Sequence, residues 1–248
     1  VCGSTQGIGY AIAKNFSEIG AKITLVSRNE KKLIKTMNSL SGKGHDFISA
    51  DFSNPKELEK KIKEKQIDKN YYSILINNTG GPPPGKISNI KNEEFLVSIN
   101  KHLICSHLLF KAVYRNMRKN NFGRIINIIS TSVKEPIPNL GLSNTTRGAV
   151  ASWSKTLSKE IGQYGITVNN ILPNSVNTSR LTNLFKAISK DESTNYFDVQ
   201  NKWIKNIPVG RIAEPEEIAY LATFLASEYA SYINGINLPI DGGKLSSF

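Results

Sequence analysis

The sequence predicts an α/β fold, a doubly wound parallel sheet with helices on both faces, and three observations support this prediction. Apolar runs of strand length alternate with longer helical patterns along the 248 residues. The short runs are rich in β-branched residues, as is typical of strands buried on both faces. Hydrophobic residues make up 39% of the chain and charged residues 21%, which supplies a sizeable core and excludes a disordered chain.

The elements follow from these patterns in chain order. Strands are expected at 23–27, 73–77, 124–129, 167–172 and 236–240, and helices at 10–20, 29–41, 54–66, 92–119, 144–162 and 215–227. The strand segments are short apolar runs, and the segments between them are long enough for right-handed helical crossovers. The helix at 144–162 carries one apolar stripe at spacings of three and four residues, formed by Val150, Trp153, Leu157 and Ile161.

The chain shows no sign of a second domain. No internal repeat or linker-like stretch interrupts it, so we expect a single nucleotide-binding domain over residues 1–248. The apolar pattern loosens over 179–207 into polar, weakly amphipathic segments. Because position 1 is Val and the first motif already starts at Gly3, we expect that the first strand of the fold is truncated here.

Composition narrows the function classes. The net charge of +12 fits a surface for a polyanion, but most basic residues are Lys and alternate with acids, as over 56–65, which is typical of a solvated helix face. We therefore do not expect nucleic acid as a partner. The two cysteines, Cys2 and Cys105, form neither a disulfide framework nor a metal-binding pattern, so we expect a reducing, cytoplasmic location and no metal. No apolar run approaches the ~18 residues of a membrane span.

A glycine-rich loop, Gly3 to Gly9, stands between an expected strand end and the first helix. Glycines at such a junction allow a tight turn and let backbone N–H groups approach a pyrophosphate. An ordinary glycine turn is the alternative interpretation. The strand at 23–27 ends on Arg28, where dinucleotide-binding folds contact the adenosine ribose. An Arg there can pair with a 2′-phosphate, so we expect NADP(H) in preference to NAD(H).

Further motifs follow along the chain, and together they resemble one known family. They are the glycine loop, Asp51 after a strand, Asn77-Asn78-Thr79-Gly80, Gly123 to Ser130, Gly165 to Asn169, Gly210-Arg211 and Asp241-Gly242-Gly243. With them the whole chain resembles the short-chain dehydrogenase/reductase family. The resemblance implies a Rossmann-like domain, an oxidoreductase with a nicotinamide cofactor, and a homotetramer or homodimer.

The resemblance also implies positions for the cofactor. The cofactor-binding residues would be Gly3, Ser4, Gln6, Gly7, Ile8 and Gly9 at the phosphates, Arg28 at the adenosine ribose, Asp51 and Phe52 at the adenine, Asn78, Thr79 and Gly80 at the ribose, Arg147 at the nicotinamide ribose hydroxyls, and Pro173, Val176 and Thr178 at the nicotinamide. The segment 179–207 would be the substrate lid, with Leu181, Leu184, Phe185, Tyr196, Phe197 and Trp203 available to cover an apolar group.

The catalytic positions depart from the family pattern. The family's Tyr-x-x-x-Lys corresponds here to Ser143-Asn144-Thr145-Thr146-Arg147, and its catalytic Asn corresponds to His102. Only Ser130 is unchanged. A Ser hydroxyl is a weaker acid than a Tyr hydroxyl, and Arg cannot relay protons as Lys does, although it can stabilise an oxyanion. The catalytic candidates are therefore Ser130, Ser143, Arg147 and His102, with Lys134 as another proton source.

Three functions stay open at this point. The first is an NADP(H)-dependent oxidoreductase acting on a small carbonyl or alcohol substrate, which could include an apolar group. The second is reduction of 3-oxoacyl groups on acyl carrier protein, but the two arginines with which such reductases dock the carrier correspond to Asn121 and Tyr164. The third is a dinucleotide-binding sensor or assembly subunit that has lost turnover, because the binding motifs are kept while Tyr and Lys are replaced.

Overall fold

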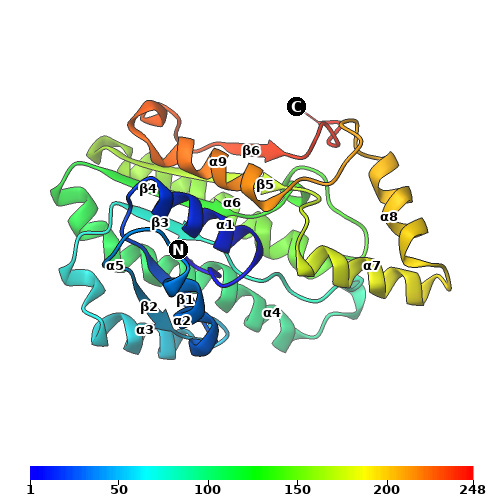
Figure 1. Ribbon diagram of the computed structural model, residues 1–248, viewed down its shortest axis with the longest axis horizontal. Helices are drawn as coiled ribbons and strands as arrows, with labels where there is room; N and C mark the ends of the chain where they lie inside the picture. The colour runs from blue at the N-terminus through cyan, green and yellow to red at the C-terminus, as the bar shows by residue number, and fades with distance from the viewer. Residues whose placement is uncertain (248) are drawn as a thin grey trace.

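A computed structural model describes residues 1–247 and shows a parallel sheet between two layers of helices (Figure 1). The strands are β1 (Thr24–Ser27), β2 (Asp46–Ser49), β3 (Ile74–Asn77), β4 (Gly123–Ile128), β5 (Ile166–Pro173) and β6 (Asn237–Ile240). They form two parallel sets, β1-β2 and β3-β4-β5-β6. These findings confirm the α/β fold class.

The N-terminal residues join the two sets of strands. The backbone N–H of Cys2 donates to the carbonyl of Ile76 in β3 (3.0 Å), and Cys2 also bridges Val26 in β1 in the parallel sense. The chain therefore continues outward from this point in opposite directions, to β1 and β2 on one side and to β3 through β6 on the other. Such a reversal of strand order leaves a crevice at the carboxyl ends of the strands, where α/β proteins bind ligands.

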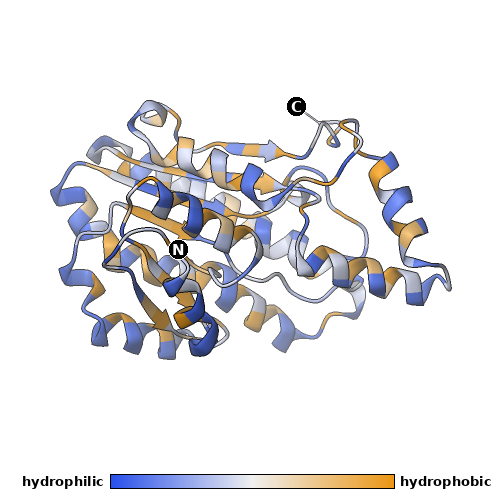
Figure 2. Cartoon of the chain, in the orientation of Figure 1, coloured by the Kyte–Doolittle hydropathy of each residue, from blue (hydrophilic) through white to orange (hydrophobic). Residues whose placement is uncertain are grey.

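Helices cover both faces of the sheet. They are α1 (Gly7–Glu18), α2 (Glu30–Asn38), α3 (Pro55–Glu64), α4 (Asn92–Ile99), α5 (Cys105–Lys119), α6 (Gly141–Ile161), α7 (Ser179–Asp191), α8 (Tyr196–Lys205) and α9 (Pro215–Ala226). One core cluster joins α1, α2 and α9 to the sheet, and a second joins α3, α5 and α6 to its other face. Figure 2 shows the hydrophobic strands between helices of mixed hydropathy. No helix within residues 1–247 is both long enough and apolar enough to cross a membrane.

A row of asparagine side chains crosses the second set of strands. Asn77 donates to Asn127 (2.8 Å), Asn127 donates to Asn170 (2.9 Å), and Asn170 donates to Asn237 (2.7 Å). Each pair is also directly opposed in the strand register. The hydroxyl of Ser154 on α6 lies against the middle of this row, accepting from Asn127 and donating to Asn170. Asn77, Asn127, Asn170 and Ser154 are buried, and each finds a hydrogen-bond partner within this row, as buried polar groups require.

The elements differ from the expected ones mainly in four places. The first helix begins at Gly7 instead of residue 10, because the glycine loop leads directly into it. The expected helix at 92–119 contains a π-helical turn, Asn100–Ile104, between α4 and α5. The loosely patterned segment 179–207 forms α7 and α8, whose buried sides are narrow: Phe185 and Val199 are their only buried residues. The strand β2 was missing from the expected strands because only Ile48 in it is buried.

Candidate functional site

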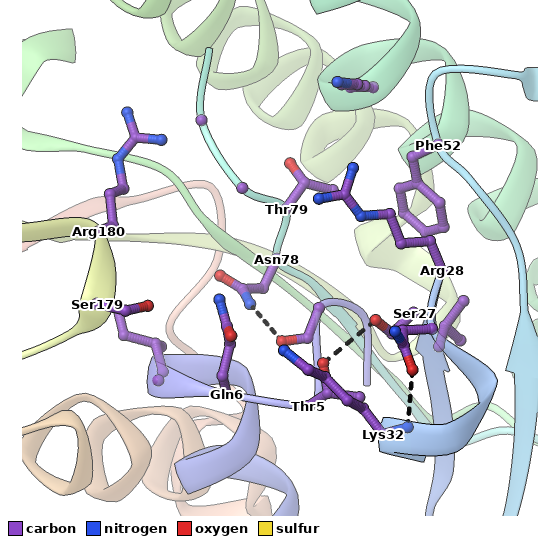
Figure 3. Close-up of a pocket in the computed structure, with 18 of the residues that line it drawn as sticks. Thr5, Gln6, Ser27, Arg28, Lys32, Phe52, Asn78, Thr79, Ser179 and Arg180 are labelled. Atoms are coloured by element: carbon purple, nitrogen blue, oxygen red, sulfur yellow. Dashed lines mark hydrogen bonds between the residues drawn. The ribbon is translucent and has the colours of Figure 1, made fainter. Parts of the chain in front are cut away.

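Two adjoining pockets open at the carboxyl ends of the strands. The first has a volume of about 480 Å³ and the second about 500 Å³. They share eight lining residues, which are Gln6, Ile8, Asn78, Thr79, Gly81, Thr178, Ser179 and Arg180. Figure 3 shows the first pocket, with the glycine loop and α1 on one side and Arg28 and Phe52 on another. The position matches the crevice expected from the strand order.

The glycine loop has a backbone that requires glycine. Gly3 and Gly7 have φ angles of 59° and 54°, in the left-handed region that L residues rarely adopt. A Cβ atom on Gly9 would lie 2.7 Å from Nδ2 of Asn78 and closer still to the carbonyl of Gly3. The loop is held in place by Asn78, whose amide donates to the carbonyls of Cys2 (3.3 Å) and Gly3 (3.5 Å). The backbone of the loop therefore packs closely against Asn78 beside the pocket.

The start of α1 opens onto the first pocket without a side-chain cap. Gln6 is the N-cap residue, its side chain makes no capping hydrogen bond, and no acid lies in the first turn. The first backbone N–H groups of a helix lack partners within the helix, and its positive dipole end attracts anions. The geometry therefore suits the phosphate groups of a dinucleotide.

The charges of the first pocket also favour an anion. Four basic side chains line it, Arg28, Lys32, Lys101 and Arg180, against one acid, Asp51. The carboxylate of Asp51 accepts a hydrogen bond from the backbone N–H of Ser53 (2.8 Å), which lowers its pKa, and the charges of Lys101 and Arg28 contribute further. Arg28 and Lys32 flank the end of β1, where the adenosine ribose of a dinucleotide would lie.

Ser130, Ser143 and Arg147 line the second pocket together. The hydroxyl of Ser130 accepts a hydrogen bond from the N–H of Ser132 (3.1 Å), which fixes its rotamer. Ser143 and Arg147 lie one turn apart on α6, and both are buried. Arg147 donates to the carbonyls of Ile128 (2.9 Å) and Thr79 (3.3 Å), while its Nε–H is buried without a partner. Burial and the nearby charge of Arg180 lower the pKa of Arg147 to about 9.

His102 lies behind this site and does not line either pocket. It belongs to the π-helical turn, is 3% exposed, and its Nδ1 atom lies 2.6 Å from the hydroxyl of Thr79. Burial lowers the pKa of His102 well below 6.5, and the charges of Arg147, Arg180 and Lys101 lower it further. The imidazole is therefore neutral at pH 7, and its Nδ1 atom is hydrogen-bonded to Thr79, which lines both pockets.

The helices α7 and α8 form one wall of the second pocket. Leu181, Leu184 and Trp203 line it. Phe185 is buried between the two helices, where its ring packs against Tyr196 (5.9 Å between centroids) and Trp203 (5.5 Å). Phe197 points outward and is 69% exposed. Of the six apolar residues considered for the lid, three face the pocket, two stabilise the α7 and α8 pair, and one faces solvent.

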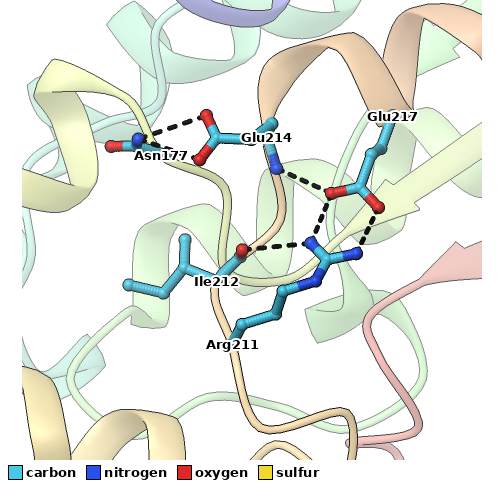
Figure 4. A network of polar contacts seen from close by, with 5 residues as sticks. All are labelled: Asn177, Arg211, Ile212, Glu214 and Glu217. Carbon is cyan, nitrogen blue, oxygen red and sulfur yellow. Dashed lines mark hydrogen bonds and ion pairs between the residues drawn. The ribbon is translucent and has the colours of Figure 1, made fainter.

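The loop between β5 and α7, which reaches both pockets, is attached to the start of α9 (Figure 4). The amide of Asn177 donates to both carboxylate oxygens of Glu214 (3.2 Å each). Glu217 accepts from the backbone N–H of Glu214 and from two nitrogens of Arg211 (2.6 and 2.8 Å). This bidentate pair holds the pKa of Glu217 at about 2. The network keeps the residues before Thr178 in a fixed position.

Most of the expected site residues lie together at the pockets. Gly3, Gln6, Gly7, Ile8, Arg28, Asp51, Phe52 and Gly80 line the first pocket, Ser130, Ser143, Arg147, Pro173 and Val176 line the second, and Asn78, Thr79 and Thr178 line both, as do Gln6 and Ile8. Ser4, Gly9 and His102 do not line either one. Ser4 belongs to the loop but is completely buried, and Gly9 is where the loop packs against itself.

Three basic residues of the site were not among the sequence candidates. Lys32 lies in the first turn of α2, four residues after Arg28, so its proximity to Arg28 in the sequence could have indicated it. Arg180 follows Thr178 on α7, in a segment whose irregular pattern gave no helix. Lys101 lies in the π-helical turn, which changes the face on which side chains emerge and which no sequence pattern marked.

Comparison with known proteins agrees with this geometry. The family described as Enoyl-(Acyl carrier protein) reductase matches residues 3–244. The 3-oxoacyl-[acyl-carrier-protein] reductase FabG of Chlamydia trachomatis is 32% identical over 98% of this chain and 95% of its own length. The NADPH-dependent reductase BacG of Bacillus subtilis is 29% identical over 100% of this chain and 97% of its own length.

Two solved structures are similar to this chain over nearly their full length. The L-sorbose reductase of Gluconobacter frateurii, complexed with NADPH and L-sorbose, superposes with a TM-score of 0.93 at 28% identity, covering 100% of this chain and 96% of that one. YwfH, an NADPH-dependent reductase involved in bacilysin biosynthesis, superposes with a TM-score of 0.92 at 28% identity, covering 100% and 98%. The family match over nearly the whole chain, the relative at 32% identity and the shared fold show that the chain belongs to the short-chain dehydrogenase/reductase family of oxidoreductases.

Proposed function

We propose that the protein is an NADP(H)-dependent oxidoreductase that acts on a carbonyl or alcohol substrate through an atypical set of catalytic residues. The observation that carries the proposal is the pair of adjoining pockets. One has a glycine loop, an uncapped helix start and four basic residues against one acid, and the other holds Ser130, Ser143 and Arg147. The similar proteins that are described as NADPH-dependent or complexed with NADPH support the same assignment.

The first pocket fits a dinucleotide with a 2′-phosphate. The pyrophosphate would approach the backbone of Gly3, Gln6 and Gly7, which line this pocket, and the close packing of Gly9 against Gly3 and Asn78 holds that loop in place. Arg28 and Lys32 would hold the 2′-phosphate, for which a guanidinium is well shaped. Asp51 and Phe52 would contact the adenine. Asn78 to Gly80 would contact the ribose, and Pro173, Val176 and Thr178 would contact the nicotinamide ring.

The second pocket supplies the polar groups for a carbonyl. When bound, the nicotinamide donates or accepts the hydride, so in the reductive direction the carbonyl carbon gains a hydride and its oxygen gains a proton. The hydroxyls of Ser130 and Ser143 would hydrogen-bond this oxygen. The positive charge of Arg147 would stabilise the developing oxyanion, and the proton would reach the oxygen from solvent through the hydroxyl of Ser143.

His102 has a positioning role in this proposal. Because its imidazole is neutral and does not line the pockets, it cannot serve as a direct proton donor at pH 7. Its contact with Thr79 instead fixes the loop that separates cofactor from substrate. Ser143 and Arg147 occupy the places of the family's Tyr and Lys in the sequence correspondence, so the chemistry depends more on electrostatic stabilisation than on an acidic phenol.

The direct test is to purify the protein, measure NADPH and NADH binding by fluorescence, and follow NADPH oxidation at 340 nm with a panel of ketones, oxo acids and 3-oxoacyl thioesters. We expect tighter binding of NADPH than NADH and oxidation with at least one carbonyl class. Tight NADPH binding with no oxidation in any class would overturn the enzymatic proposal.

Two alternatives have their own tests. The identity with FabG favours reduction of 3-oxoacyl groups on acyl carrier protein, which predicts that 3-oxoacyl carrier is reduced far faster than the free thioester. A dinucleotide-binding sensor would bind NADPH without turnover. In that case the double variant S143Y/R147K should gain reductase activity, because it restores the family's acid and its lysine. Ser143 faces a pocket with space for the larger ring.

We also propose that the chain forms a homotetramer or homodimer. Large aromatic side chains are exposed on α9 and in the segment that follows it. They are Tyr220, Phe224, Tyr229 and Tyr232, and Tyr232 is fully exposed. Aromatic residues are enriched in the centres of protein interfaces. Sedimentation velocity of the wild type and of Y229S/Y232S tests the assignment, because a monomeric wild type would exclude it.

A further inference from the structure

The second pocket is lined by positive charges and by no negative charge among the described residues. Arg147 and Arg180 are the only ionisable residues that line it in the described part of the chain, and no Asp, Glu or Lys accompanies them. Arg147 is 8% exposed and has no carboxylate partner. A buried cation without a counter-ion is costly unless a ligand supplies the opposite charge.

The two arginines hold the same loop from two elements. Arg147 on α6 donates to the carbonyl of Thr79 (3.3 Å), and Arg180 on α7 donates to the carbonyl of Pro82 (3.3 Å). Gly81 lies between these two positions, and a Cβ atom there would lie 2.5 Å from the guanidinium nitrogens of Arg180. The absence of a side chain at Gly81 thus lets Arg180 approach the loop closely. Both guanidinium groups are held at the pocket by neutral carbonyls, which leaves their charge uncompensated.

The position of Arg180 on α7 strengthens this imbalance. It is the second residue of the helix, and no acid lies in the first turn. The positive end of a helix dipole disfavours a cation. The nearby charge of Arg180 also contributes to the lowered pKa of Arg147, which indicates that the two groups repel each other. An anion between them would relieve both effects.

The remaining walls define the rest of the ligand. Pro82, Pro83 and Pro84 line one part of the pocket, and Leu181, Leu184 and Trp203 line another. Arg147 lies one turn from Ser143 on α6, and Arg180 reaches the carbonyl of Pro82, so both charges lie beside walls that are apolar at the prolines, the leucines and Trp203. A carboxylate matches the planar fork of an arginine in a bidentate arrangement.

We infer that the substrate is an oxo acid, with a carboxylate within a few bonds of its carbonyl and an apolar remainder. Arg147 and Arg180 bind the carboxylate, and the carbonyl lies at Ser130 and Ser143. The inference rests on the proposed reductase function for the identity of the reacting group, but the carboxylate site is a property of the pocket and is tested separately. It distinguishes this protein from reductases of neutral sugars or thioesters.

The test compares matched acid and ester pairs on the full chain saturated with NADP(H). Phenylpyruvate and 4-phenyl-2-oxobutanoate are compared with their methyl esters, by NADPH oxidation for turnover and by quenching of tryptophan fluorescence with NADP⁺ present for binding. We expect the acids to bind about 10- to 100-fold more tightly than the esters, the range for one or two charge-assisted hydrogen bonds.

The variant R180Q should remove most of the preference for the acid, and R180K should keep part of it. Arg180 also lines the first pocket, so NADPH affinity is measured for each variant and turnover is compared at saturating cofactor. R115Q, which removes an equal charge from the exposed surface of α5 outside both pockets, serves as the matched control and should retain the preference.

The outcomes separate the two proposals. Equal binding of acid and ester by the wild type, or an acid preference that R180Q leaves unchanged, would overturn the carboxylate site even if ketones are reduced. Acid-selective binding that depends on Arg180, without any NADPH oxidation, would establish the carboxylate site and refute the reductase. If NADPH itself does not bind, the same fluorescence titration without cofactor decides the carboxylate site.

Discussion

The hydroxyl of Thr79 and the Nδ1 atom of His102 lie 2.6 Å apart, so a buried neutral imidazole supports the loop that separates the two pockets. The Nε2 atom of the same ring is buried without a partner. The contact therefore joins a titratable group to the geometry of the site, although this group contacts neither pocket directly.

Acid should destabilise the protein through His102. The folded pKa lies well below 6.5, so the unfolded state binds more protons as pH falls below 6.5, and stability decreases by up to about 1.4 kcal/mol per pH unit. The carboxylates with lowered pKa values, such as Glu217, affect stability only at lower pH, where they become protonated. H102N should reduce the slope between pH 6.5 and about 5 in urea titrations, because an amide can bond Thr79 without titrating. His107 also has a lowered pKa, so H107N is the comparison. If the unfolding free energy of H102N depends on pH as steeply as that of the wild type, the prediction is wrong.

Cofactor choice should depend on Arg28. In R28D, a carboxylate replaces the guanidinium beside the expected 2′-phosphate, so we expect NADPH affinity to fall about 100-fold and NADH affinity to rise. Fluorescence titration with both cofactors measures the ratio. K32Q should lower NADPH affinity by a smaller factor, since Lys cannot pair in a bidentate manner. An unchanged ratio in R28D would show that the 2′-phosphate lies elsewhere.

The glycine loop should not tolerate a side chain at Gly9. In G9A the methyl group would contact Asn78 and the Gly3 carbonyl, so the loop has to open and the amide of Asn78 loses its acceptors. We expect NADPH affinity to fall more than about 10-fold while the circular dichroism spectrum is retained. G148A is the control, because a Cβ atom at Gly148 meets nothing within 4 Å. Normal NADPH affinity in G9A would contradict this account of the loop.

The asparagine row should contribute strongly to stability at its centre. N127L removes the shared partner of Asn77, Asn170 and Ser154, all of them buried, and we expect unfolding free energy to fall by about 2–4 kcal/mol. N237A removes the exposed end of the row and should cost less than about 1 kcal/mol. Urea titrations of both variants measure the two losses of unfolding free energy. Equal losses would show that Asn127, at the centre of the row, contributes no more than its exposed end.

The sequence predicted the fold well where the patterns are local. β3 to β5 are short runs rich in Ile, Val and Leu, interrupted by the buried asparagines, and the apolar stripe of α6 gave that helix within three residues at each end. The pattern failed at α7 and α8, because those helices bury little of their surface and pack mainly on each other. Periodicity depends on burial, so a wall that faces a pocket carries a weak signal.

The sequence predicted the residues of the candidate site that belong to backbone motifs, and it did not predict the single charged residues Arg180 and Lys101. Gly3, Gly7 and Asn78 stand in motifs whose geometry requires those residue types. Arg180 and Lys101 act through their positions in space, which depend on the α7 helix and on a π-helical turn. His102 had the right chemical type for proton transfer, but burial beside two arginines gave it a different electrostatic environment. Single residues of this kind are determined by tertiary structure.

The eight residues shared by the two pockets have a kinetic consequence. Whatever fills the first pocket becomes part of the boundary of the second, since Asn78, Thr79 and Arg180 face both. A substrate that arrives first would find one side of its pocket missing and would also obstruct the entry of the larger ligand. The architecture therefore favours a compulsory order, with the dinucleotide entering first and leaving last, and product-inhibition patterns would report that sequence of events.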